Sequence, residues 1–433
     1  MLIGKQSIDQ VTDALRHTTS HTPKKAFVAS ISPQTLASLS VRYARTESGP
    51  RDALSLELLL DRISRALHTI GFDAVGDTTF ARELALREHV REFHERKAKG
   101  AGAIPMHAGS CPGWVCYAEK AQAELLPYVS TSKSPQQVAG LLAKLVIGRA
   151  LGRAPADVYH VTVMPCYDKK LEASRPDNAV DDVPEVDCVL TTGELHDLLL
   201  TQGFDPYAET QTIHKIRTDE PASSELAFPR LLAQPGGSSG GSSGGYLFAV
   251  MQDVWKMHPD AALETREIRS SDYTEYTLRV HRGEESSVVF KGAVCYGFRN
   301  LQNLVRKVQR ETGVRGRGGR GLVRRVRGGD DTPYDHVEVM ACPGGCANGG
   351  GQMRPPRGTV APDTENDGAR AVGWQGTSRE WVKLVDDAYW TGESGAAPAA
   401  PCALDAFDAQ LDGHMRTVYH GVQPETNGLA VQW

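Results

Sequence analysis

The sequence predicts an α/β protein with two lobes and twisted, mainly parallel sheets. Short apolar runs alternate along the chain with longer segments in which apolar residues recur at helical spacing, and this alternation is typical of an α/β architecture. A chain of 433 residues is too long for one small core, which favours one large domain or two lobes. With 40% hydrophobic and 23% charged residues, the composition is that of an ordinary soluble globular protein.

The first predicted elements are a strand and a helix. The apolar run at residues 25–31 predicts a short buried strand, and residues 54–70 carry the spacing of an amphipathic helix. Ser134 predicts another helix start, because serine can cap, Pro135 suits the first helical position, and Gln137 completes a capping box. This helix should bury one apolar stripe made of Val138, Leu141, Leu142, Leu145 and Val146.

The alternation continues through the rest of the chain. Further predicted strands cover residues 159–164, 186–190 and 336–340. Further predicted helices run from Gly193 to near Gly203 and over residues 299–310 and 378–390. No internal repeat is evident.

Composition sets the expected boundaries of that domain. We predict a leader at residues 1–25, the main domain at residues 26–395, and a C-terminal segment and tail at residues 396–433. Residues 234–245 (QPGGSSGGSSGG) have linker composition and should be flexible. Residues 313–331 are rich in glycine and arginine and favour a solvated loop, although such arginines could also neutralise RNA phosphates.

Charge and hydropathy exclude several classes of function. The net charge of −5 gives no global positive field for nucleic acid or a membrane surface. Apolar stretches fall well short of the roughly 18 residues of a membrane span, and the N-terminus lacks the apolar core of a secretory signal. The eight cysteines are therefore interpreted as reduced thiols and possible metal ligands in the cytosol.

Four cysteines lie in unusual sequence contexts. Cys111 is in SCPGWVC, Cys166 is in MPCYDKK, and Cys342 and Cys346 share CPGGCANGGGQ. Each context follows an apolar stretch, and ligands of open α/β sheets collect outside the carboxyl ends of strands, so three segments could converge there. The neighbouring lysines, Lys169 and Lys170, should favour thiolates by lowering their pKa.

The spacing of these cysteines permits more than one chemistry. Four thiolates suit a [4Fe-4S] cube, with one thiolate for each iron, but four thiolates also suit a structural zinc ion. Alternatively, Cys111 and Cys166 could be small core residues, which is the common role of a free cysteine. The other four cysteines are predicted to be structural or without a partner: Cys116, Cys188, Cys295 and Cys402.

Several longer motifs accompany the cysteine contexts and point to a family. The quoted stretches span residues 28–34, 126–137, 159–176, 186–193 and 296–303. Together with the cysteine contexts, they resemble the active-site motifs of the iron-only hydrogenase superfamily. The resemblance is strongest to its non-hydrogenase eukaryotic branch, the nuclear prelamin A recognition factor-like or cytosolic iron–sulfur assembly component 3 family. It extends from about Ala26 to Trp433.

The resemblance implies a fold, a cofactor and partners. It implies an iron-only hydrogenase-like fold in which Cys111, Cys166, Cys342 and Cys346 ligate a [4Fe-4S] cluster in a central cleft. The implied role is delivery of clusters to cytosolic and nuclear apoproteins. The implied partner is a targeting complex with a WD40-propeller subunit, on which the tail ending in Trp433 docks as an aromatic anchor.

Two departures from the family pattern qualify this expectation. Hydrogenases of the superfamily carry a proton-relay cysteine where this chain has Ser110, a poor acid–base group, so the resemblance implies no hydrogen turnover. The family also has an N-terminal four-cysteine site, whereas no cysteine precedes Cys111, so one cluster is expected here. Three alternatives remain at this point: a redox enzyme with hydrogenase-type chemistry, a zinc-stabilised interaction module, and an RNA-associated protein.

Overall fold

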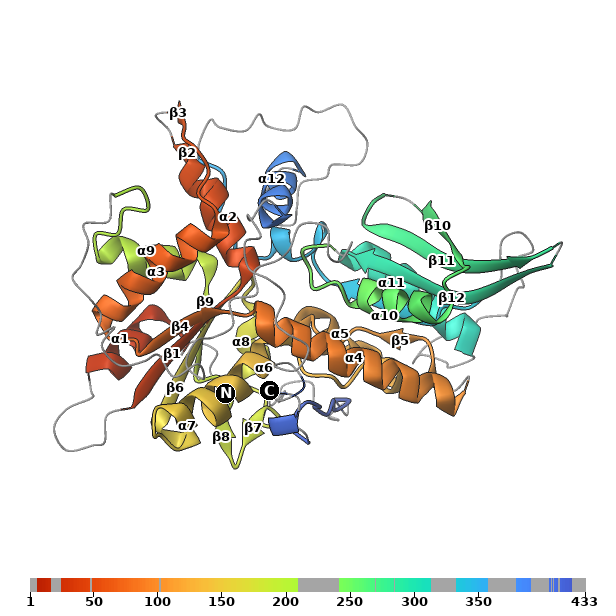
Figure 1. Ribbon diagram of the computed structural model, residues 1–433, viewed down its shortest axis with the longest axis horizontal. Coiled ribbons are helices and arrows are strands. Elements are labelled where there is room, and N and C mark those ends of the chain that lie inside the picture. Colours follow the sequence, from red (N-terminus) through yellow and green to blue (C-terminus); the bar gives the residue numbers. More distant parts are fainter. Residues whose placement is uncertain are drawn as a thin grey trace, which may run out of the picture.

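The structure is a computed structural model in which two lobes lie side by side, linked by long helices that run beneath both (Figure 1). It describes residues 6–16, 25–46, 49–100, 103–208, 241–312 without 269 and 284, 332–356, 379–390, and 405–422 without 406, 408 and 412. The arginine-rich segment at residues 313–331, Cys402 and Trp433 lie outside the described residues.

The first lobe is built on a four-stranded parallel sheet in the order β4-β1-β6-β9. Its strands are β1 (Ala26–Ile31), β4 (Ala74–Asp77), β6 (Val158–Met164) and β9 (Cys188–Thr191). Every residue of β1, β6 and β9 is buried, which explains why these strands appear in the sequence as continuous apolar runs. One face packs against the helices α1 (Ile8–Arg16), α2 (Pro33–Ala44), α3 (Leu56–Ile70) and α9 (Thr192–Thr201).

The second lobe has a mixed sheet in the order β10-β11-β12-β13-β5. Its strands are β10 (Ala262–Glu267), β11 (Tyr273–Arg282), β12 (Glu285–Tyr296), β13 (His336–Met340) and β5 (Met106–His107). The first three form an antiparallel meander, and β13 pairs in parallel with both β12 and β5. The helices that pack on this sheet are α10 (Tyr246–Met257) and α11 (Phe298–Thr312). The expectation of mainly parallel sheets therefore describes the first lobe, and the meander was not predicted.

The region between and beneath the lobes is helical. It comprises α4 (Thr79–Lys99), α5 (Pro112–Ala121), α6 (Pro135–Leu141), the π-helical η4 (Leu142–Ile147), α7 (Gly148–Ala150) and α8 (Asp168–Ala173). The helix α12 (Arg379–Trp390) instead packs against α2 in the core of the first lobe. Short elements complete the fold: β2 (Arg45–Thr46), β3 (Gly49–Pro50), β7 (Ala179–Val180), β8 (Val183–Pro184), η3 (Ala123–Tyr128), η5 (Pro155–Asp157) and η6 (Gly345–Asn348). α4 packs against both α6 and α10, so it joins the two lobes.

Most predicted elements are confirmed to within a few residues, but the capping box at Ser134 is wrong. Ser134 is the N-cap of α6, yet its side chain makes no capping hydrogen bond. Its hydroxyl instead accepts a hydrogen bond from Lys169 Nζ at 3.1 Å. A tertiary partner has therefore replaced the local one.

Residues 242–245 also contradict their predicted role as part of a flexible linker. All four are buried, and Gln34 Nε2 donates a hydrogen bond to the Ser242 carbonyl at 2.6 Å. Their glycine and serine content resembles that of a linker, but here small residues are needed because the backbone enters a crowded region just before α10.

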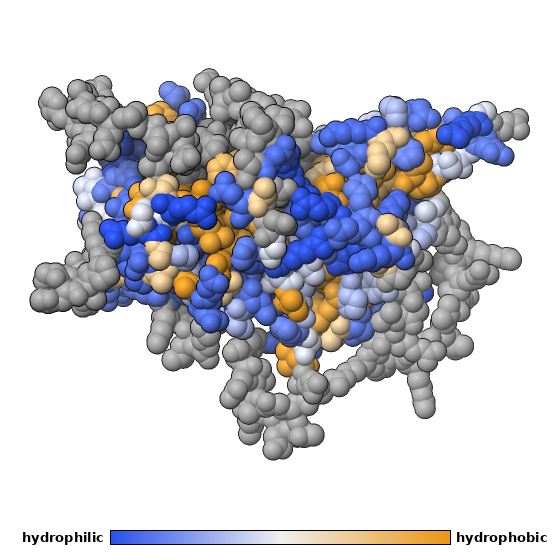
Figure 2. All heavy atoms as spheres, turned by 60° about the horizontal axis from the view of Figure 1, so that its bottom comes forward, coloured by the Kyte–Doolittle hydropathy of each residue, from blue (hydrophilic) through white to orange (hydrophobic). Residues whose placement is uncertain are grey.

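Figure 2 shows one face of the molecule, on which hydrophilic side chains predominate and hydrophobic ones form separate areas. Among the helices of the described ranges, none is both long and apolar enough to cross a membrane.

Candidate metal centre

Three loops bring the four cysteines together between the lobes. Cys111 immediately precedes α5, Cys166 follows β6 by two residues, and Cys342 follows β13 by two residues, with Cys346 in η6. The loops are tied to one another: the Ala341 N–H contacts Cys111 Sγ at 3.4 Å, and the Gly351 N–H donates to the Pro165 carbonyl at 2.9 Å. The parallel strands thus deliver these cysteines from their carboxyl ends, as expected.

The pKa of two of these thiols depends on the neighbouring cysteines. Burial raises the pKa of Cys166 well above its usual value, and the charges of Cys346, Cys111 and Cys342 add to this effect. Burial and then Cys111 raise the pKa of Cys346 to about 12. The four residues keep some surface accessibility, but protein atoms surround the sulfurs densely enough for desolvation to dominate. The Cys166 thiol therefore lies near the other three cysteines in poorly solvated surroundings.

The side chain of Lys169 brings a positive charge close to these thiols. Its Nζ donates to the Ser110 carbonyl and to Ser134 Oγ, both at 3.1 Å, and to Glu172 Oε2 at 2.5 Å. Its charge opposes the effect of burial and lowers the pKa of Cys111, Cys166 and Cys346. The predicted influence of Lys169 is therefore present, but burial outweighs it.

Lys170, by contrast, does not serve the thiols as predicted. Its Nζ pairs with Glu194 Oε1 at 2.6 Å and donates to the Gln6 carbonyl at 2.8 Å. The two lysines are adjacent on α8, and successive residues of a helix point in different directions, so only one of them can face the cysteines.

Ser243 is a site residue that sequence reasoning missed. Its Oγ accepts a hydrogen bond from the Cys346 N–H at 2.9 Å, which fixes the start of η6. Gly345 passes so close that a Cβ there would lie 2.0 Å from Ser243 Oγ, and its φ of +71° also favours glycine. Ser243 lies in the segment interpreted as a linker, so composition concealed it.

A buried carboxylate lies behind the same turn. Glu338 of β13 accepts hydrogen bonds from Tyr296 Oη at 2.7 Å and from the Leu247 N–H at 2.9 Å, and burial raises its pKa. The negative charge of Glu338 also raises the pKa of Cys346. Sequence reasoning interpreted this strand as apolar and missed Glu338.

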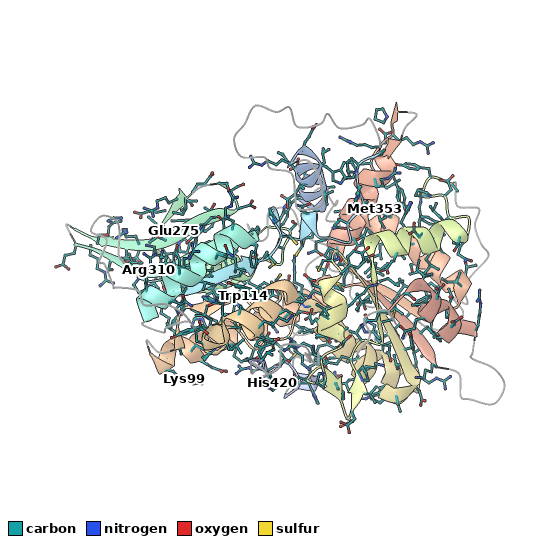
Figure 3. The ribbon with its side chains drawn as sticks, turned by 180° about the vertical axis from the view of Figure 1, so that it is seen from behind. Lys99, Trp114, Glu275, Arg310, Met353 and His420 are labelled. Atoms are coloured by element: carbon teal, nitrogen blue, oxygen red, sulfur yellow. The ribbon has the colours of Figure 1, made fainter. Side chains whose placement is uncertain are left out.

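Residues a short distance beyond the cysteine turns anchor them to opposite lobes. Trp114 packs in the core of the second lobe, while the Met353 N–H donates to Ser38 Oγ on α2 of the first lobe at 3.0 Å. The Trp381 indole also donates to the Met353 carbonyl at 3.0 Å. Figure 3 shows Trp114 near the middle of the molecule and Met353 on the side of the first lobe.

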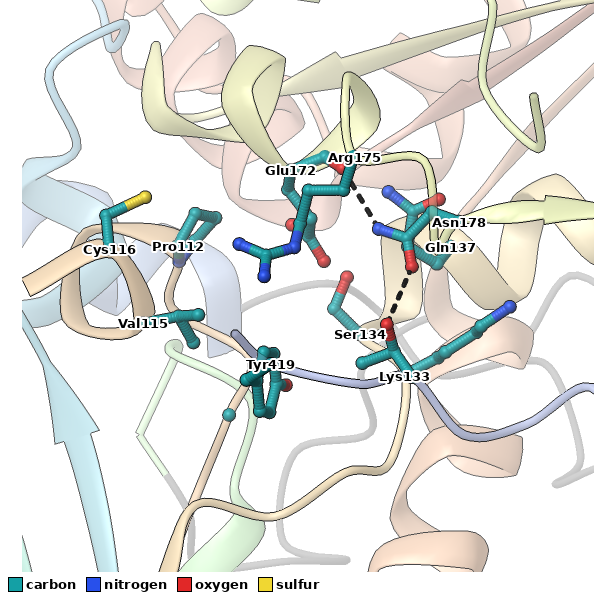
Figure 4. Close-up of a pocket in the computed structure, with 12 residues that line it drawn as sticks. Pro112, Val115, Cys116, Lys133, Ser134, Gln137, Glu172, Arg175, Asn178 and Tyr419 are labelled. Carbon is teal, nitrogen blue, oxygen red and sulfur yellow. Dashed lines mark hydrogen bonds between the residues drawn. The ribbon is translucent and has the colours of Figure 1, made fainter. Parts of the chain in front are cut away.

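A small polar cavity adjoins the Cys111 turn (Figure 4). It has a volume of about 20 Å³, which is room for about one water molecule. Arg175 pairs with Glu119 and lies 5.4 Å from the centre of the Tyr419 ring. Thr417 Oγ1 donates to Asn178 Oδ1 at 3.2 Å, so residues near the C-terminal end close this side of the site. No motif in the sequence indicated this arrangement.

Three histidines, one each from α4, β5 and β13, are buried close to one another. The Nε2 atoms of His89 and His336 lie 2.7 Å apart, and the ring centre of His107 lies 5.7 Å from that of Trp114, with the two rings tilted. Burial lowers the pKa of His89 to about 4 and that of His107 to about 3, and that of His336 falls well below its usual value. These histidines are therefore neutral near pH 7.

The remaining cysteines behave as predicted where the structure describes them. Cys188 in β9 and Cys295 in β12 are fully buried among apolar residues, and Cys116 lies on α5. Across the described ranges, no group of three or more His, Cys, Asp or Glu side chains is close enough to hold a single metal ion.

Comparisons with known proteins agree with this architecture. Residues 25–350 match the family model described as iron only hydrogenase large subunit, C-terminal domain. The fold is that of solved [FeFe]-hydrogenases: a variant of HydA1 from Chlamydomonas reinhardtii has a TM-score of 0.65 at 20% identity, covering 96% of this chain and 98% of that one.

Curated relatives are more similar in sequence. The cytosolic Fe-S cluster assembly factor NAR1 of Cryptococcus neoformans is 42% identical over 86% of this chain and 68% of its own length. The NAR1 of Mycosarcoma maydis is 36% identical over 92% of this chain and 72% of its own. The cytosolic iron-sulfur assembly component 3 of Mus musculus is 36% identical over 100% of this chain and 83% of its own. The chain therefore belongs to the NAR1 and cytosolic iron–sulfur assembly component 3 family, within the iron-only hydrogenase-like fold.

Proposed function

We propose that Cys111, Cys166, Cys342 and Cys346 hold one [4Fe-4S] cluster. The observation that carries this proposal is the convergence of three loops around Cys166, whose thiol pKa is raised by the charges of Cys346, Cys111 and Cys342 in addition to burial. The donor set fits the group, because a cube takes four thiolates and hydrogen bonds to its sulfurs tune it. The Ala341 N–H beside Cys111 Sγ is such a donor. When bound, the cluster would supply one-electron chemistry at this centre.

A cube fits this arrangement better than zinc. A tetrahedral zinc ion with bonds of about 2.3 Å requires sulfurs about 4 Å apart. A cube binds one thiolate at each iron corner and so accepts sulfurs that are spaced more widely. The relatives named as iron–sulfur assembly factors also favour the cube.

The proposed role is that of an assembly factor that helps deliver [4Fe-4S] clusters to cytosolic and nuclear apoproteins. The support is the identity of 33–42% with relatives named as cytosolic iron–sulfur assembly factors. We place the protein in the cytosol, with assembly machinery and client apoproteins as partners. A targeting complex with a WD40-propeller subunit is the proposed docking partner of Trp433, which lies outside the described residues.

A redox enzyme is the second candidate, favoured by the hydrogenase fold. Ser110 argues against it. Its side chain, a hydroxyl with a very high pKa, replaces the relay thiol, and its carbonyl accepts a hydrogen bond from Lys169. A serine there cannot exchange protons readily near neutral pH, so carriage of a cluster rather than catalysis is the proposed activity.

Anaerobic reconstitution tests the cluster. Wild-type protein should contain about four iron and four sulfide per chain, and Cys346→Ala should retain less than about a quarter of that iron. Cys116→Ala is the matched control, since Cys116 is a nearby cysteine on α5 outside the thiol set, and it should keep full iron. Stoichiometric zinc without sulfide would refute the cube, and hydrogen-dependent dye reduction would support the enzyme.

A further inference from the structure

A second pocket lies at the opposite edge of the first lobe's sheet from the cysteines. It has a volume of about 300 Å³ and is lined by Lys144, Leu145, Arg149, Gly152, Arg153 and Pro155. It adjoins the start of β6, because Lys144 Nζ donates to the Val158 carbonyl at 2.6 Å. The cysteine loop follows the other end of that strand, about 20 Å away at 3.3 Å per residue. The two sites are therefore separate, and this inference is independent of the proposed function.

The pocket has an excess of positive charge. Lys144 is almost fully buried and its ammonium pairs with Asp187 Oδ2 at 2.6 Å. Burial and the nearby charge of Lys25 lower the pKa of Lys144, while Asp187 opposes them. Arg149 and Arg153 form no ion pair with any residue that the structure describes. The charge of Lys144 is thus balanced by Asp187, whereas the charges of Arg149 and Arg153 are not balanced by any described residue.

The local backbone fixes where the two arginines stand. η4 is a π-helix, and such turns occur frequently at functional sites. The chain then turns sharply, with the Arg153 N–H on the Gly148 carbonyl at 2.7 Å and the Gly152 N–H on the Arg149 carbonyl at 3.0 Å. Gly152, at φ +66°, has open space where a Cβ would point. The turn therefore places both arginines in the lining of the pocket, and Gly152 adds no side chain that would fill it.

We propose that this pocket binds a small ligand through a phosphate group. Two uncompensated guanidinium groups can each donate paired hydrogen bonds to phosphate oxygens, which is the geometry that arginine serves better than lysine. The volume matches small-molecule sites, and Leu145 and Pro155 offer apolar surface to the rest of the ligand. Free phosphate and a nucleotide share this chemistry.

Calorimetric titration of the full chain at fixed ionic strength tests the proposal, with inorganic phosphate, pyrophosphate and ATP as separate probes. We expect saturable binding of at least one probe at one site per chain. Arg149→Gln combined with Arg153→Gln should weaken it at least about tenfold, because charged hydrogen bonds are lost. Tighter binding of ATP or pyrophosphate would identify a polyphosphate ligand, and equal or tighter binding of phosphate would identify the free ion.

The matched control removes the same charge elsewhere. Lys256 and Arg282 are exposed residues of the second lobe, and Lys256→Gln combined with Arg282→Gln should leave the affinity within about twofold. Equal weakening in both double variants would mean non-specific attraction and would overturn the proposal. Absence of saturable binding by all three probes, or unchanged affinity in the pocket variant, would also overturn it. In that case the arginines only complement the C-terminal dipole of their helix.

Discussion

Buried cysteines occur in two regions of this molecule, the cleft between the lobes and the interior of the sheets, and they differ in their neighbours. Cys188 and Cys295 lie inside strands, and burial raises the pKa of each to about 12. Cys346 in the cleft reaches a similar pKa. A raised pKa therefore does not distinguish a ligand from a packing residue. What distinguishes the cleft is that several thiols from distant segments act on one another there.

The largest expected effect that would test this comparison is at the turn that presents Cys346. Gly345→Ala should reduce the iron retained after anaerobic reconstitution by at least about half, because a Cβ 2.0 Å from Ser243 Oγ must displace either the turn or the hydroxyl that accepts the Cys346 N–H. Iron and sulfide per chain are the measurement.

Gly283→Ala provides the control for that substitution. Gly283 has φ +65°, similar to Gly345, but a Cβ there meets open space. It should cost about 1 kcal/mol of unfolding free energy from backbone strain and leave iron unchanged. Full iron content in Gly345→Ala would mean that the close contact with Ser243 does not position the cysteine.

Lowering the pH should destabilise the protein through its buried histidines rather than through the cysteines of the cleft. The folded pKa of His89 is about 4 and that of His107 about 3, below the unfolded value of about 6.5. The unfolded chain therefore binds more protons between these values, and stability present above pH 6.5 is lost as the pH falls. At pH 5.5 each histidine should cost about 1.4 kcal/mol. Chemical unfolding at pH 7.5 and 5.5 measures the difference.

Two variants locate that loss. His89→Gln should reduce the loss of stability between pH 7.5 and 5.5, whereas His414→Gln, at an exposed position, should not. Cys346→Ala should show the same loss as the wild-type apoprotein, because the histidines lie outside the thiol set. An unchanged loss in His89→Gln would contradict the assignment to this buried histidine.

Sequence reasoning succeeded where a chemically distinctive residue closely follows a strand that the sequence pattern predicts. β1, β6 and β13 are short buried strands rich in apolar residues, and Cys166 and Cys342 each follow one of them, so both the strands and the convergence of their ends could be predicted. The lobe whose sheet is fully parallel was predicted best, since burial on both faces leaves an unambiguous pattern.

The rest depends on contacts between distant residues. Ser243 resembles a linker residue until the Cys346 N–H is placed beside it, and Glu338 is concealed in an otherwise apolar strand. β10 is exposed throughout and carries the residues Ala-Leu-Glu-Thr-Arg-Glu, which give no clear strand periodicity. Ser134 matched a local capping rule, but its hydroxyl is taken by Lys169. A rule based on neighbouring residues alone, such as the capping box, fails where a distant residue takes the same hydrogen-bonding group.

The smallest effect on the cleft is expected at the far end of the chain. Deleting Trp433 should leave iron and sulfide per chain unchanged, because the four thiols are held by contacts within the two lobes. If the proposed docking is right, the same deletion should weaken binding to a WD40-propeller subunit at least about tenfold, since one buried aromatic anchor often carries most of the binding free energy of a small contact. Val422→Ala, which removes an exposed apolar side chain 11 positions earlier, is the control and should bind normally. Loss of iron on deletion would show that the tail and the cleft are coupled, and unchanged binding would rule out docking through Trp433.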